Sequence, residues 1–197
     1  MARPRIDDAE ERLLAAGLQL FARLGTERVN SNAIAKRARL GVGTFYAHFS
    51  DKYALLRALQ LRTLAAIRAA RVQALADAGP DPMDRVRASI AAVARFAEAH
   101  PEAYRVTFGR ERTAAAAHGP IVSESSRPTA AALRELQARG LLAADLDVEL
   151  AARAYLSMEV GMLLWWLEDK TRAQRAGLVE TLSRLHPAAA AGPPVGG

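Results

Sequence analysis

Residues 30–49, which read NSNAIAKRARLGVGTFYAHF, decide the fold of this chain. Asn30 is a favourable N-cap residue, and Ile34 and Ala38 lie on one small apolar face of the short helix that it begins. A tight turn at residues 39–41 ends that helix. A second short helix is expected directly after the turn.

The second helix separates an apolar side from a polar one. Val42, Phe45 and Phe49 recur at helical spacing and are expected to bury together. The other faces carry small or hydrogen-bonding side chains. Two short helices joined by a tight turn form the helix-turn-helix pattern, whose second helix enters the major groove of DNA. The shape alone leaves a plain helical hairpin as an alternative.

Residues on the polar side suit contact with DNA. Gly43 has no side chain, so the helix backbone can approach DNA closely. Thr44 offers a hydroxyl for a phosphate or a base and a methyl for thymine. Tyr46 and His48 are long enough to reach phosphates or base edges.

Two neighbouring helix N-termini add candidate phosphate contacts. Lys52 falls in the first turn of the next expected helix, where free backbone N–H groups also favour an anion. Asn30 and Ser31 stand at the start of the preceding helix and can serve in the same way. The candidate DNA-binding residues are therefore Asn30, Ser31, Gly43, Thr44, Tyr46, His48 and Lys52.

The charge of the chain is more informative by position than by size. The net charge is +6, but only three of the 27 basic residues are lysine, a bias that GC-rich codon usage produces whatever the function. Residues 23–52 carry a net charge of +4, against +3 over the much longer segment 53–197. This local excess beside the two short helices favours an anionic backbone as partner.

Four motifs between residues 12 and 56 resemble the DNA-binding domain of the TetR family of bacterial transcriptional regulators. They are LF-x-x-x-G at residues 20–25, IA-x-x-A at 34–38, G-T-[LF]-Y-x-[HY]-F at 43–49 and [SD]-K-x-x-LL at 51–56. The resemblance implies DNA contacts by Thr44, Tyr46, His48 and Lys52. The chain departs from the family pattern at Arg39, Gly41 and Tyr53, where a turn glycine, an N-cap serine and a glutamate are usual.

The remaining sequence has helical periodicity nearly throughout, which predicts an all-α fold. We expect an N-terminal arm and helix-turn-helix domain over residues 1–52, a helical effector-binding and dimerisation domain over 53–186, and a disordered tail over 187–197. Residues 109–127 contain Gly-Pro and Arg-Pro steps and are expected to form an irregular connection. Thr171 and Gln174 have the spacing of a capping box that would begin the last helix.

The segment 148–167 is apolar around most of its circumference. This predicts a helix that either lies at the centre of one domain or is covered on two sides, by its own domain and by a partner. Helix-turn-helix proteins commonly pair to occupy two half-sites, and the TetR resemblance implies a dimer built by the last two long helices. By this resemblance, we expect the dimer interface to lie within residues 147–186. The candidate interface residues are Trp166, Leu167, Leu178, Leu182 and Leu185.

The resemblance also implies an effector pocket in the C-terminal body. Aromatic and methionine side chains suit a small hydrophobic or aromatic ligand, although the same residues at helical spacing are ordinarily plain core. The candidate ligand-binding residues are Phe96, His100, Tyr104, Phe108, Met158, Met162 and Trp165. His100 or Tyr104 would supply the polar contact.

Other functional classes receive little support. The chain has no cysteine, no H-E-x-x-H motif, no phosphate-binding glycine loop and no nucleophile elbow, and its four histidines lack ligand spacing. No cofactor, metal site or catalytic residue is therefore expected. No segment has the length of a membrane span or the form of a signal peptide, so a cytoplasmic protein is expected. Together with the helix-turn-helix motifs, the TetR resemblance implies a ligand-responsive, homodimeric repressor acting on a palindromic operator. A protein-binding helical adaptor, and less strongly a small all-α enzyme, are the alternatives.

Overall fold

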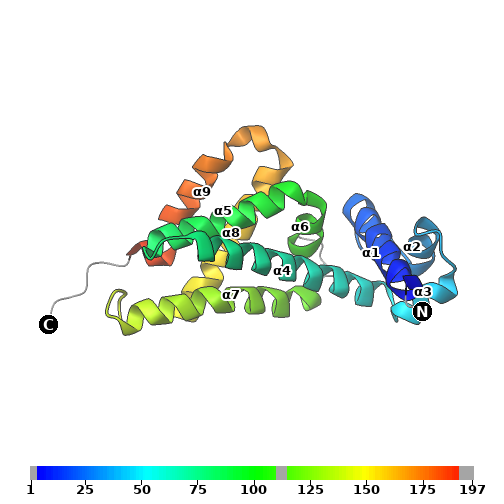
Figure 1. Ribbon diagram of the computed structural model, residues 1–197, viewed down its shortest axis with the longest axis horizontal. Helices are drawn as coiled ribbons and strands as arrows, with labels where there is room; N and C mark the ends of the chain where they lie inside the picture. The colour runs from blue at the N-terminus through cyan, green and yellow to red at the C-terminus, as the bar shows by residue number, and fades with distance from the viewer. Residues whose placement is uncertain (1–3, 110–114, 191–197) are drawn as a thin grey trace. The chain divides into compact units, whose positions relative to one another are not determined.

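The computed structural model describes residues 4–109 and 115–190, and these residues form helices without any β-strand (Figure 1). The all-α fold class is therefore confirmed. The α-helices are α1 (Pro4–Leu24), α2 (Ser31–Arg37), α3 (Val42–His48), α4 (Lys52–Asp77), α5 (Pro82–Ala99), α6 (Pro101–Phe108), α7 (Ala115–Ala138), α8 (Val148–Glu168) and α9 (Arg175–Arg184). Short 3-10 helices span Lys170–Arg172 and Pro187–Ala190. None of the described helices is long and apolar enough to cross a membrane.

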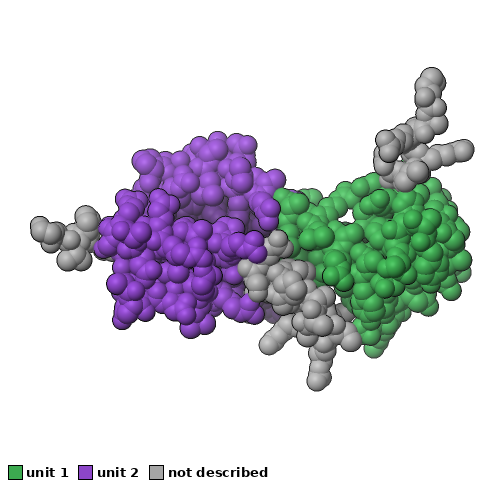
Figure 2. Space-filling view, turned by 90° about the horizontal axis from the view of Figure 1, so that it is seen from below, with its two compact units in different colours: residues 1–65, 100–117 green, residues 66–99, 118–197 purple. Residues whose placement is uncertain are grey.

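The chain divides into two compact units (Figure 2). Unit 1 contains residues 1–65 and 100–117, and unit 2 contains residues 66–99 and 118–197. The helix α4 contributes to both. The boundary expected at residue 52 does not coincide with this packing, because the first turns of α4 supply core residues to unit 1 and α6 joins that unit from far along the chain.

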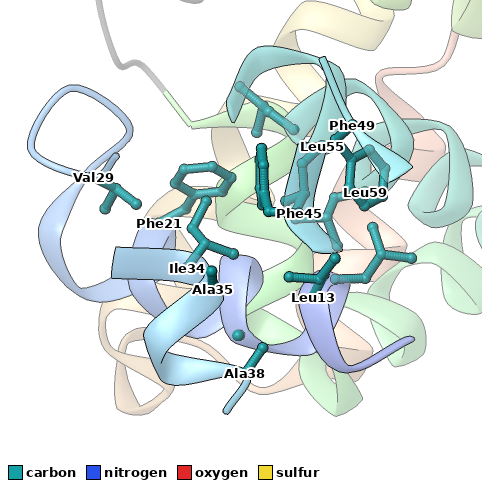
Figure 3. Close-up of a cluster of buried hydrophobic side chains, with 13 residues drawn as sticks. Leu13, Phe21, Val29, Ile34, Ala35, Ala38, Phe45, Phe49, Leu55 and Leu59 are labelled. Atoms are coloured by element: carbon teal, nitrogen blue, oxygen red, sulfur yellow. The ribbon is translucent and has the colours of Figure 1, made fainter. Parts of the chain in front are cut away.

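The core of unit 1 joins the first four helices (Figure 3). Leu13, Ile34, Phe45 and Leu55, one from each of α1 to α4, are completely buried. α6 packs against α1, and its Val106 is half-buried against the same cluster. Burial of this many apolar side chains is the main stabilising contribution to so small a unit.

Side-chain caps and a glycine set the helix boundaries in unit 1, among them the predicted Asn30 cap. Gly25 ends α1 with a φ of 78°, a left-handed conformation that glycine adopts without strain. The Asn30 side chain accepts a 2.8 Å hydrogen bond from the Ala33 N–H at the start of α2. Asp51 accepts 2.8 Å bonds from the N–H groups of Tyr53 and Ala54 and so caps α4.

In unit 2, α5 packs against both α8 and α9. A second apolar cluster includes Leu133 of α7 and Ala152 of α8. Asp147 caps α8 by accepting hydrogen bonds from the N–H groups of Glu149 and Leu150. The apolar circumference of α8 is explained in part by this packing within the chain.

Three local expectations differ from the structure. α7 begins at Ala115, so most of the expected irregular connection is helical; the alanines there favour a helix. Gln174 stands at the N-cap of α9 without a side-chain bond, and Asp169 rather than a Thr171 capping box accepts the hydrogen bonds before it. Pro187–Ala190, at the start of the predicted tail, form a 3-10 helix with Ala188 buried; residues 191–197 lie outside the described residues.

Candidate nucleic-acid interface

The helix α3 has one buried side and one exposed side. Phe45 is fully buried and Phe49 is 7% exposed, so these two rings fix the helix on the core of unit 1. Tyr46 is 57% exposed and its ring meets Phe45 edge-on, with the centroids 5.4 Å apart. The prediction that Val42 buries with the two phenylalanines is wrong: at the first position of α3 it is 44% exposed.

The glycine in this helix is not required by the packing of the chain. A Cβ built on Gly43 would meet no heavy atom within 4 Å. Gly43 is exposed and Thr44, next to it, is half-buried. The N-terminal part of α3 therefore presents bare backbone, a hydroxyl and the Tyr46 ring on one accessible surface.

The two candidate DNA contacts at the start of α2, Asn30 and Ser31, differ in how exposed their side chains are. Asn30 is exposed, yet its side-chain oxygen is already occupied by the Ala33 N–H. Its amide nitrogen remains the donor that a phosphate would need. Ser31 is half-buried.

Lys52 is held inside the unit. Its Nζ donates a 2.9 Å hydrogen bond to the Thr26 carbonyl and a 3.4 Å bond to the Glu27 carbonyl, and it lies 5.0 Å from the centre of the Tyr53 ring. Lys52 therefore fastens the α1–α2 loop to α4. The two N–H groups that Asp51 caps are likewise already satisfied at this helix start.

His48 also turns toward its own unit. Its side chain is only 12% exposed, and its Nδ1 lies 3.9 Å from the Glu10 carboxylate on α1. Among the seven candidate DNA contacts, the side chain of His48 lies near a carboxylate and that of Lys52 donates to two carbonyls, all within unit 1.

Sequence reasoning missed Arg12 of α1. Its Nη2 donates to the carbonyls of Ala38 and Arg39, at 2.8 and 3.1 Å, in the turn between α2 and α3. Arg39 itself has a φ of 57°, the left-handed conformation that explains the usual glycine of the motif. Since Arg12 and this turn are 26 residues apart, no local pattern could have revealed the contact.

The basic residues of this region stay on the surface. Arg23, Arg28, Lys36, Arg37 and Arg39 are all exposed. The Arg37 guanidinium donates a 2.7 Å hydrogen bond to Gln19, which leaves its charge uncompensated by an acid in that contact. Positive charge on the surface of unit 1 is thus available to an anionic partner.

The candidate ligand-binding residues fall into different units. His100, Tyr104 and Phe108 belong to unit 1, where the rings of Tyr104 and Phe108 lie 4.7 Å apart and Tyr104 is buried. The others, Phe96, Met158, Met162 and Trp165, belong to unit 2. Phe96 and the two methionines are half-buried, whereas Trp165 is 41% exposed with the Arg172 guanidinium 5.2 Å from its ring centre.

Four of the five predicted interface residues are buried within the chain itself. Trp166, Leu167, Leu178 and Leu182 are at most 6% exposed, and the Trp166 Nε1 donates to the Ala173 carbonyl. Of the five, only Leu185, at 57%, has an exposed side chain. The apolar period of α8 cannot distinguish its own core from an interface, which explains the difference.

Unit 2 also contains a buried charged group that no sequence pattern predicts. The Glu159 carboxylate of α8, 3% exposed, accepts two 3.2 Å bonds from Arg71 of α4. Burial and this carboxylate raise the pKa of the Tyr155 hydroxyl, which donates to the Leu182 carbonyl. Burial, helped by the Arg71 charge, lowers the pKa of His186 to about 4.

Within the described part of the chain, no three histidine, cysteine, aspartate or glutamate side chains gather where they could hold a metal ion. The buried Arg71–Glu159 ion pair is not fully satisfied, because the Arg71 Nε is buried without a hydrogen-bond partner among the described residues.

Comparison with known proteins agrees with the geometry of unit 1. A family model described as bacterial regulatory proteins, tetR family, matches residues 13–59. The HTH-type transcriptional regulator BetI of Stenotrophomonas maltophilia (strain R551-3) is 35% identical over 80 residues. The match covers 41% of each chain, so it spans about two fifths of that relative's length.

Solved structures share the fold over nearly the whole chain. The fatty acid degradation regulator FadR from Bacillus halodurans gives a TM-score of 0.76 at 18% identity, covering 94% of this chain and 95% of its own. A putative TetR-family transcriptional regulator from Syntrophomonas wolfei gives 0.77 at 17% identity, covering 97% and 99%. At such identities the likeness establishes the fold, and the relatives are regulators rather than enzymes.

Proposed function

Since the chain belongs to the TetR family of bacterial transcriptional regulators, we propose that it is a ligand-responsive repressor that binds a palindromic DNA operator as a homodimer. Its place of action would be the cytoplasm. The observation that carries the proposal is the two-sided α3, with Phe45 buried and Tyr46 exposed. A helix fixed in this way can enter a major groove without rearrangement.

In this proposal the N-terminal half of α3 makes the closest contacts. Gly43 allows the backbone to approach the bases, Thr44 contacts a base or phosphate, and the exposed Tyr46 reaches the sugar–phosphate backbone. Asn30 and Ser31 bind phosphate from the start of α2. His48 and Lys52 can add their charge to the field at the DNA surface, although both have partners within unit 1.

Pairing of two copies would place two recognition helices on successive half-sites. Exposed apolar side chains near the last two long helices, Trp165 and Leu185, support an interface there, with the buried Trp166, Leu167, Leu178 and Leu182 as its rigid base. A small hydrophobic or aromatic effector would bind among half-buried residues such as Met158, Met162 and Phe96. It would favour a dimer whose recognition helices no longer match the operator.

Selection of bound duplexes from a random DNA pool tests this function. We expect an inverted repeat to be enriched. Tyr46→Ala should weaken binding of the enriched duplex by about tenfold or more, since it removes a central contact of the recognition helix. Binding is measured by fluorescence anisotropy at fixed salt.

Leu61→Ala is the matched control, because Leu61 is a similarly exposed large side chain of unit 1, at 52%, that lies on α4 rather than α3. It should leave binding unchanged. Failure of the pool to enrich any sequence would contradict the proposed function. Equal affinity of wild type and Tyr46→Ala would contradict the assignment of α3 as the recognition helix.

A further inference from the structure

The turn between α2 and α3 has an unusual residue at its critical position. The Arg39 N–H donates to the Lys36 carbonyl and the Leu40 N–H donates to the Ala35 carbonyl, at 3.1 and 2.9 Å. This pair of bonds is a Schellman motif, in which the residue after the helix takes a positive φ and is ordinarily glycine. Here Arg39 takes a φ of 57°.

The other positive-φ helix ends of the described chain provide a comparison. α1 ends at Gly25 and α7 ends at Gly140, with φ values of 78° and 71°. At the end of α7 the Gly140 and Leu141 N–H groups make the same two bonds as those after α2. Among the described residues, only Arg39 is a non-glycine residue with positive φ. Such a residue has an energetic cost in this conformation because its Cβ approaches the backbone.

Arg12 binds this same turn between α2 and α3. The Arg12 Nη2 donates to the Ala38 and Arg39 carbonyls, at 2.8 and 3.1 Å, while its Nη1 lies 3.4 Å from the Asp8 carboxylate. Hydrogen bonds from a charged donor are stronger than neutral ones. They also satisfy carbonyls at the C-terminal end of α2, where the helix carries partial negative charge.

We propose that Arg12 is a positioning residue for DNA recognition: it holds the strained Arg39 turn and so fixes the direction in which α3 leaves α2. This inference rests on the proposed function. Arg12 touches no nucleotide in this role, because its Nη2 is committed to the two carbonyls. In this proposal Arg12 affects DNA binding through the angle between α2 and α3, which sets the position of α3 in the major groove.

The test combines two substitutions. Arg12→Met keeps most of the aliphatic stem and removes the donors, and Arg39→Gly removes the strain that Arg12 offsets. We expect Arg12→Met to weaken binding of the pool-selected duplex by about tenfold, the size of effect that a lost charge-assisted contact produces. In the Arg39→Gly background the same substitution should weaken binding by no more than about twofold, because glycine adopts the turn unaided.

Affinity is measured at a temperature well below the thermal unfolding midpoint of each variant. A merely stabilising role for Arg12 would then leave the affinity of the folded protein unchanged, and that result would overturn the proposal. The slope of log affinity against log salt separates positioning from phosphate contact. The slope should be the same for wild type and Arg12→Met, whereas a lost phosphate contact reduces it by about one for each contact.

Two further results would overturn the proposal. If Arg12→Met does not fold, the Arg12→Met/Arg39→Gly double variant must fold and bind; an unfolded double variant would overturn the proposal. An equal penalty for Arg12→Met in both backgrounds would do the same. Absence of DNA binding by the wild-type protein would instead refute the proposed function, so the two failures are distinguishable.

Discussion

At the scale of single residues, His186 shows how burial determines chemistry. Its Nδ1 accepts a 3.1 Å hydrogen bond from the Ala188 N–H, and its ring meets Tyr155 edge-on at 4.5 Å. Both contacts suit a neutral ring, in agreement with a pKa lowered from 6.5 to about 4. The folded chain therefore binds fewer protons than the unfolded chain at mildly acid pH.

This difference predicts a pH dependence of stability. The unfolded state takes up a proton near pH 6.5 and the folded state only near pH 4, so stability falls as the pH is lowered through that interval. The loss amounts to at most about 3 kcal/mol over the whole interval, of which at most about 2 kcal/mol falls between pH 7.5 and pH 5. Urea unfolding at pH 7.5 and pH 5 measures it. His186→Asn, which keeps an acceptor for the Ala188 N–H, should show a smaller loss; an identical loss in both proteins would refute the assignment.

Single residues also mark the limit of sequence-based inference. The Asn30 cap, the Asp147 cap and Gly25 were predictable because capping depends on a few adjacent residues. The bonds of Lys52 to the α1–α2 loop and of Arg12 to the Arg39 turn were not, since each joins residues that are 26 positions apart. Motif resemblance identifies a lysine at this position but not the atoms that its ammonium group meets.

At the scale of secondary-structure elements, a side chain added at Gly43 of α3 is expected to change stability and DNA binding in opposite directions. A Cβ at Gly43 would meet nothing within 4 Å. Gly43→Ala should therefore raise the stability of the free protein, by up to about 1 kcal/mol, because alanine favours a helix. The same methyl group would lie between α3 and the DNA, so binding of the pool-selected duplex should weaken.

Gly161→Ala is the stability control for this prediction, since a Cβ at Gly161 of α8 is equally uncrowded. It should raise the thermal midpoint and leave the affinity for DNA unchanged, provided that the mass in solution is also unchanged. Gly43→Ala with unaltered affinity would show that the α3 backbone does not approach DNA closely.

At the same scale, α8 shows why interface residues are harder to predict from a sequence than helices. Its run of apolar residues predicts cover on two sides, but the described chain covers one side and leaves Leu150 and Trp165 exposed, at 64% and 41%. Periodicity does not reveal which neighbour provides the cover, and the chain itself buries Trp166 and Leu167. The adjacent Trp165, 41% exposed, is the tryptophan available at the surface.

At the scale of the whole molecule, the proposed dimer makes DNA binding depend on protein association. Leu185 is 57% exposed beside α9, so Leu185→Glu would place a charge in the proposed interface. We expect this variant to sediment as a monomer at micromolar concentration and to lose high-affinity binding. Leu61→Glu, an equally exposed position in unit 1, should remain dimeric. A monomeric wild-type protein would contradict the proposed interface.

Unit 1 is discontinuous in sequence, and this has a consequence for synthesis of the chain. α6 packs against α1, but residues 66–99 belong to the other unit and are made before it. At about 5–20 residues per second, a ribosome needs about 2 to 9 seconds to pass from the end of the first segment to the end of α6. During that interval the surface of α1 that α6 later covers is open to other nascent chains and to chaperones. Unit 1, which contains the proposed recognition helix, is therefore not complete until α6 has been translated.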